Sequence, residues 1–89
     1  MKIKNELKVQ NVGGENIILL QGTHGVDTTK IVSLNETSLW LWNRFADRDF
    51  TAEDVADALK DEFGIDSGLA EKDAKTWIDM MVQNRLIEQ

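Results

Sequence analysis

The spacing of apolar residues divides the chain into a β-rich first third and a helical remainder. A weak alternation predicts a strand over about residues 7–12, and the continuous apolar run of residues 17–20 predicts a more buried strand over about 16–21. Gly13-Gly14 supplies hairpin chemistry between them, because glycine tolerates positive φ. Ile31 and Val32 are β-branched and predict a third strand over about 30–34. Together these segments predict a small three-stranded antiparallel sheet.

Helical spacing governs the rest of the chain. Asn35 is a strong N-cap residue for a helix over about 36–47. Thr51 and Asp54 are spaced as a capping box for a second helix over about 52–63, which Gly64 ends. A third helix over about 67–84 is predicted by apolar residues that recur along one face: Ala70, Ala74, Trp77, Ile78 and Met81.

These elements predict one domain over residues 1–89. The order of three strands followed by three helices places it in the α+β class. The second and third helices are joined by a short connection, as in a helix-turn-helix pair. We therefore expect a winged-helix-like domain with a small N-terminal sheet.

The junction between the third strand and the first helix contains no linker, because Asn35 directly follows the strand. This arrangement favours an open sheet edge held against the helices, where another chain can add a strand. On the third helix, Met80 and Val82 lie off the predicted core face. Methionine is common on peptide-binding surfaces, although each residue alone also fits a role as core filler. The pattern favours a peptide-binding module.

Composition narrows the classes of function. The 89 residues carry a formal net charge of −6, which argues against nucleic acid, because phosphate binding needs a basic surface. Apolar runs are too short to span a membrane, and the N-terminal segment lacks a secretory core, so we expect a cytoplasmic protein without a membrane partner. The absence of cysteine excludes disulfides and thiolate metal sites.

No catalytic constellation is evident in the sequence. His24 is the single histidine and lies in a glycine-flanked segment, so the pattern predicts no metal site. The many carboxylates fall on polar helix faces or in first turns, where negative charge favours the helix dipole. We therefore predict a protein that is not an enzyme and has no catalytic residues, no bound metal and no cofactor.

The run Val32-Ser33-Leu34-Asn35-Glu36-Thr37, followed by Leu39 and Trp42, resembles the signature of PqqD-like proteins, the peptide chaperones of pyrroloquinoline quinone biosynthesis and their relatives. The likeness extends in order over essentially the whole chain. Its further matching positions are 51–56, Leu59, 63–66, Ala70, Asp73, Trp77, Ile78, Met81, Leu86 and Ile87.

The resemblance implies a RiPP recognition element, a domain that binds the leader of a ribosomally made precursor peptide. Such domains hold the leader as an added strand between the third strand and the third helix, and present it to a modifying enzyme, often a radical S-adenosylmethionine (SAM) enzyme. They perform no chemistry themselves. Carried onto this sequence, the peptide-binding residues are Thr29, Lys30, Ile31, Val32, Ser33, Ile78, Met81 and Val82.

Two segments differ from the pyrroloquinoline quinone members, namely residues 25–29 before the third strand and 47–49 after the first helix. The resemblance therefore leaves the peptide product open. Two other functions also stay open. One is a winged-helix DNA-binding regulator, which would need a basic face. The other is a protein-interaction domain that forms a homodimer through its open strand edge.

Overall fold

The computed structural model describes residues 1–4, 7–21 and 29–88. Three antiparallel strands followed by three helices confirm the predicted α+β class, and a pair of very short strands is added to them. The elements in chain order are β1 (Lys2–Ile3), β2 (Val9–Val12), β3 (Glu15–Gln21), β4 (Thr29–Leu34), α1 (Glu36–Phe45), α2 (Ala52–Phe63), α3 (Ser67–Gln83) and β5 (Ile87–Glu88).

The main sheet has the strand order β2-β3-β4, with both pairs antiparallel. Gly13 and Gly14 form the turn between β2 and β3 with φ of 61° and 87°, the left-handed backbone that favours glycine at this point. In the β3–β4 pair, Ile18 faces Val32 and Leu19 faces Ile31. Residues 22–28, between these two strands, lie outside the described residues.

The β1–β5 pair was not predicted from the sequence. Lys2 faces Glu88 and Ile3 faces Ile87, and the Lys4 N–H donates to the Leu86 carbonyl at 3.0 Å. Strands of two residues are too short to show a period of two, so the sequence carries no sign of them. The pair nevertheless holds Leu86 and Ile87 against the core, where both are buried.

Side chains cap all three helices, and the caps of α1 and α2 are those that the sequence predicts. Asn35 accepts from the Ser38 N–H at the start of α1, and Asp66 accepts from the Leu69 N–H at the start of α3. Thr51 and Asp54 form the reciprocal capping box of α2, in which aspartate replaces the usual glutamate. These caps fix where each helix begins, and so fix the angle at which β4 leads into α1.

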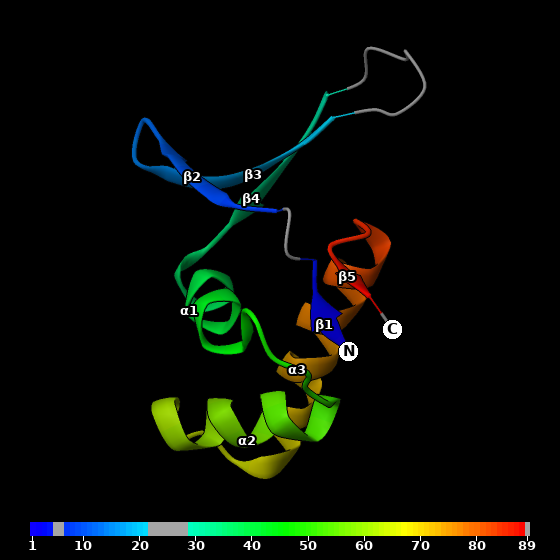
Figure 1. Ribbon diagram of the computed structural model, residues 1–89. Coiled ribbons are helices and arrows are strands. Elements are labelled where there is room, and N and C mark those ends of the chain that lie inside the picture. Colours follow the sequence, from blue (N-terminus) through cyan, green and yellow to red (C-terminus); the bar gives the residue numbers. More distant parts are fainter. Residues whose placement is uncertain (5–6, 22–28, 89) are drawn as a thin grey trace.

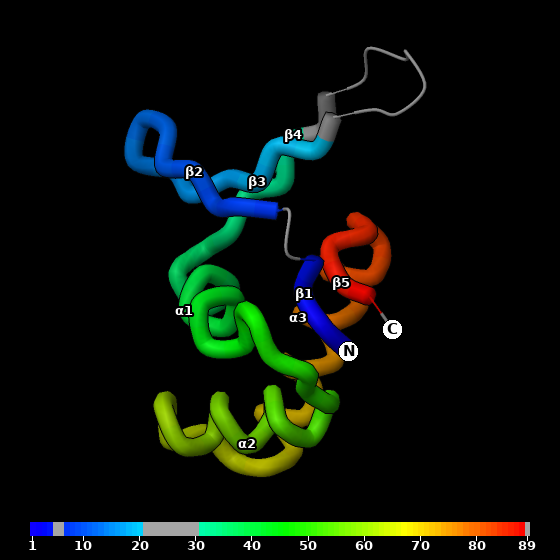
Figure 2. The backbone as a smooth tube through the Cα atoms, in the orientation of Figure 1, coloured from blue at the N-terminus to red at the C-terminus, as the bar shows by residue number. Residues whose placement is uncertain are grey.

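The core lies where the inner face of the sheet meets the helices. Ile18 and Val32 reach it from the sheet, and Leu41 from α1. An aromatic cluster continues the core among the helices, with ring centroids 5.0 Å apart for Phe45–Phe50 and 5.9 Å apart for Phe50–Trp77. Figure 1 shows the sheet at one end of the molecule and α2 at the other, with α1 between them. The tube in Figure 2 shows β4 leading directly into α1.

Candidate functional site

β4 forms one edge of the main sheet. It pairs with β3 along six residues, from Thr29 opposite Gln21 to Leu34 opposite Asn16, and no described strand pairs with its other side. β2 forms the opposite edge and is shorter, with four residues. An unpaired edge presents N–H and C=O groups to which an extended chain can bond. β4 therefore provides the longer template of the two edges.

Side chains along β4 alternate between the core and solvent. Val32 and Leu34 are buried, whereas Ile31 is 59% exposed and Ser33 is also exposed. This alternation is the period-two pattern of a strand with one covered face. Thr29 and Lys30 begin the strand and are placed by their backbone alone. All five β4 residues predicted to bind peptide thus belong to this edge strand.

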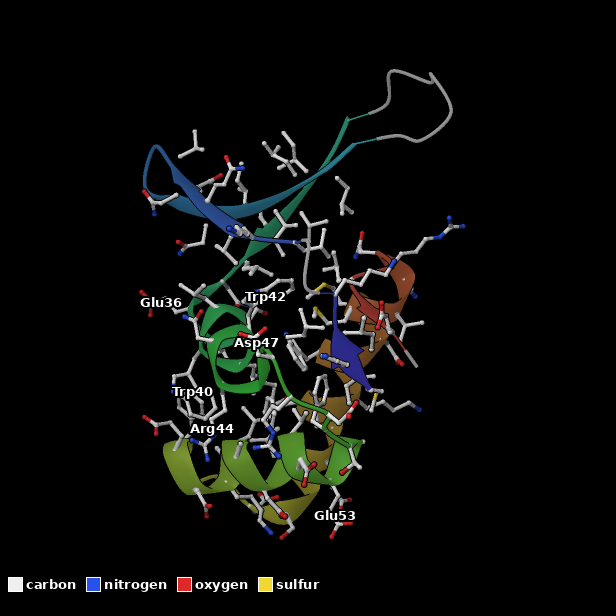
Figure 3. All side chains as sticks on the ribbon, in the orientation of Figure 1. Glu36, Trp40, Trp42, Arg44, Asp47 and Glu53 are labelled. Atoms are coloured by element: carbon white, nitrogen blue, oxygen red, sulfur yellow. The ribbon has the colours of Figure 1, made fainter. Side chains whose placement is uncertain are left out.

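A hollow of about 650 Å³ lies where β4 ends and α1 begins. Ser33 and Leu34 line it from β4, Asn35 and Ser38 from the start of α1, and Met80 from α3. Its remaining lining residues are Gly14, Glu15, Asn16 and Glu36. Figure 3 shows Glu36 projecting outward from the start of α1. The end of the edge strand is therefore joined to a recess whose opposite wall is α3.

A second hollow of about 350 Å³ is joined to the first, because Asn35, Ser38 and Met80 line both. Its other lining residues are Thr37, Leu41, Leu59, Asp73, Thr76 and Trp77. We call the two hollows together the Met80 cleft. The cleft runs from the end of β4, past the first turn of α1, to the flank of α3 that carries Asp73, Thr76 and Met80.

One polar atom in the wall of the Met80 cleft is unusual. Trp77 is 5% exposed, and its indole Nε1 is buried without a hydrogen-bond acceptor among the described residues. Buried donors almost always have partners, and an unpaired one costs about 1–3 kcal/mol. The indole thus brings an unused hydrogen-bond donor to the residues around the cleft.

The α3 residues that the sequence suggested lie elsewhere on the helix. Ile78 lines a separate hollow of about 540 Å³ between α2 and α3, together with Lys60 and Lys75. Val82 follows Ile78 by one helical turn and is 39% exposed, while Met81 is 0% exposed inside the core. The structure therefore brings none of these three residues to the recess beside β4. A guest chain could reach Met81 only if the side chains above it moved.

Met80 is the α3 residue that the structure does bring to β4, and it was absent from the predicted binding residues. Its signal was present in the sequence, since Met80 falls off the stripe of core positions. Periodicity shows that Met80 lies outside the core face of α3. Which neighbouring element Met80 faces depends on how α3 packs on α1 and α2. The β4-facing flank could therefore not be selected from spacing alone.

The solvent face of the main sheet is also apolar. Register places Val12, Ile17, Leu19 and Ile31 on this face, opposite Ile18 and Val32. Val12, Leu19 and Ile31 are exposed, whereas Ile17 is buried without belonging to the main core. The continuous run of residues 17–20 therefore reflects a central strand that is apolar on both faces.

The described residues contain no group of three His, Asp or Glu side chains that could hold a metal ion. His24 lies outside the described residues. No described helix is long and apolar enough to cross a membrane. The features that remain as a candidate site are the edge of β4 and the Met80 cleft.

Comparison with known proteins gives one family. The family model described as "Coenzyme PQQ synthesis protein D (PqqD)" matches residues 18–87, a segment that runs from the middle of β3 to the start of β5. It includes the whole of β4 and α3, and thus both sides of the candidate site. No curated protein and no solved structure matches the chain.

Proposed function

Because the family match covers most of its length, the chain belongs to the PqqD family, and we propose that it is a non-catalytic, winged-helix-type protein that binds the leader of a ribosomally made precursor peptide. The leader adds a strand to the open edge of β4. The protein then presents the rest of the precursor to a modifying enzyme, which we propose to be of the radical SAM type. The observation that carries the proposal is the long unpaired edge of β4 beside the Met80 cleft.

Strand addition supplies affinity without much selectivity. Each main-chain hydrogen bond contributes about 1 kcal/mol net, so the β4 edge offers only a few kcal/mol to any extended peptide. A micromolar complex needs about −8 kcal/mol. The remainder must come from guest side chains that bury apolar surface, at about 25 cal/mol per Å². The Met80 cleft lies at the end of β4, and the half-buried Met80 is the apolar side chain of its wall that a guest can cover.

Methionine suits this position for a physical reason. Its unbranched, polarizable side chain adapts to guests of different shape, and Met80 is half-buried at the junction of the two hollows. It can therefore pack against a guest without leaving a void in the core. This supports Met80, together with Ile31 to Ser33, as the contact surface for the leader.

Charge argues against the DNA-binding alternative. Along α3 and its end, the exposed basic residues Lys72, Lys75 and Arg85 are balanced by Glu71, Asp73 and Asp79. A helix that reads DNA needs an excess of positive charge, because phosphate contacts provide much of the affinity. With a net charge of −6 for the whole chain, a peptide guest is the better match.

The experiment is an NMR titration of the ¹⁵N-labelled protein with a synthetic leader taken from any short precursor-like reading frame found beside its gene. We expect amide shifts at residues 31–34, at Ser38 and around Met80, with little change at Glu53 and Asp57, which line the separate hollow between α2 and α3. Shifts confined to the solvent face of the sheet, or no shifts at millimolar peptide, would contradict strand addition to β4.

A further inference from the structure

The Met80 cleft has one sign of charge. Three carboxylates line it, from Glu15, Glu36 and Asp73, and no lysine or arginine is among the described residues that line either hollow. The first turn of α1 adds the partial positive charge of a helix N-terminus, but Glu36 in that same turn opposes it. The cleft is therefore acidic as well as partly apolar.

The hollow on the other flank of α3 has a different character. Lys60 and Lys75 line it together with Glu53, Asp57 and Glu71, so that both signs are present, and Lys60 lies 3.8 Å from Asp57 in an ion pair. The two flanks of α3 thus differ in charge. Lys60 and Lys75 line the hollow between α2 and α3, away from β4. Because only one flank carries an acidic cleft, that flank should favour guests with positive charge.

The smaller hollow of the cleft is apolar at its floor and charged at its rim. Leu41 and Leu59 are buried at its apolar floor, and the half-buried Met80 forms part of its wall. Asp73 is exposed at the rim and takes part in no ion pair among the described residues. A long side chain with an apolar stem and a cationic end matches this order, because its methylenes can bury while its charge stays near water.

Building on the proposed function, we propose that the guest peptide anchors itself through a lysine or arginine whose side chain enters the hollow between α1 and α3 and pairs with Asp73. The stem lies against Leu41, Leu59 and Met80. A carboxylate in the same place would face Asp73 and Glu36, and an uncharged apolar side chain would gain no attraction from Asp73. The anchor selects basic leaders, whereas the edge of β4 accepts any extended sequence.

The first arm of the test is a selection that makes no assumption about the leader. Random twelve-residue peptides are displayed and enriched on the immobilised full-length protein. We expect the enriched peptides to share one lysine or arginine within an otherwise β-prone segment. Enrichment of peptides that shift β4 amides but carry no shared basic residue would overturn the anchor while leaving strand addition intact. Failure of any peptide to shift β4 would instead count against the proposed function.

The second arm is a double-mutant cycle on one enriched peptide. Asp73→Asn should weaken binding of the peptide about two- to fivefold, and should leave unchanged the binding of a peptide in which glutamine replaces the basic residue. Glu71→Gln is the matched control, because it removes one carboxylate from the same helix but lines the opposite hollow. The proposed pairing with Asp73 would be overturned if Asp73→Asn weakened both peptides equally. It would also be overturned if Glu71→Gln weakened the basic peptide as much as Asp73→Asn does. Thermal denaturation of each variant verifies that it is folded.

Discussion

The Ser38 backbone N–H donates a 2.8 Å hydrogen bond to Oδ1 of Asn35, so the residue that follows β4 is also the residue that starts α1. Asn35 has extended backbone angles, with φ −74° and ψ 177°, which continue the strand up to the first helical residue. One side chain therefore fixes the angle between the edge strand and the helix below it, and with it the opening of the Met80 cleft.

We expect Asn35→Ala to lower the free energy of unfolding by about 1 kcal/mol, because alanine cannot accept from an N–H in the first turn of α1. Urea denaturation followed by circular dichroism measures this loss. Asn35→Asp keeps an acceptor and should remain close to wild type. An alanine variant as stable as the aspartate variant would show that the cap contributes nothing.

Substitutions at two adjacent β4 positions test the alternation of its faces. Ile31→Thr should change stability by no more than about 0.5 kcal/mol, because Ile31 is largely exposed. Val32→Ala should cost about 1–3 kcal/mol, since Val32 is buried beside Ile18 in the core. If the order of the two effects were reversed, the strand would be shifted by one residue, which exchanges its faces.

Trp77→Phe removes an indole N–H that has no acceptor within residues 1–4, 7–21 and 29–88. Loss of the unpaired donor should offset part of the packing lost with the larger ring, so we expect a net cost below about 1 kcal/mol. Trp42→Phe is the matched comparison, because Trp42 is equally buried and its nitrogen is not among the buried unpaired atoms. Chemical denaturation should find Trp42→Phe the more damaging change.

Met80→Gln tests which flank of α3 faces the guest. We expect it to weaken binding of a fluorescent leader peptide about tenfold in an anisotropy titration, because it replaces apolar wall in the cleft by an amide.

The control for that change is Val82→Gln, an exposed substitution on the other flank of α3. It should leave the anisotropy curve unchanged. The family resemblance had placed Val82 among the peptide-binding residues. A loss of affinity in this variant and none in Met80→Gln would therefore favour the flank of α3 that carries Ile78 and Val82.

Local chemistry made much of the fold predictable. The glycine turn after β2, the Asn35 cap and the Thr51–Asp54 capping box each depend on neighbours within a few residues, and each is found as the sequence indicated. The pairing of Lys2–Ile3 with Ile87–Glu88 depends on contacts between the ends of the described chain. No local pattern encodes such a pairing, and it could not be predicted.

The candidate site was predictable on one side only. The edge strand follows from Ile31 and Val32 and from the cap at Asn35, all within a short segment. The wall opposite depends on the rotation of α3 about its axis, which is set by packing with α1 and α2. Spacing placed Ile78 and Met81 on one apolar face of α3. In the structure Met81 is buried in the core, and Ile78 lines the hollow beside α2.

Ionic strength should act in opposite directions on two surfaces of this protein, the exposed apolar face of the sheet and the acidic Met80 cleft. Two copies that meet through Leu19 and Ile31 each bring a charge of −6, and added salt screens that repulsion and favours the contact. The cationic guest that we propose for the Met80 cleft would be attracted by the same charge, and added salt would weaken that attraction. We therefore expect high ionic strength to favour any contact between copies over the proposed peptide binding, and low ionic strength to favour the guest.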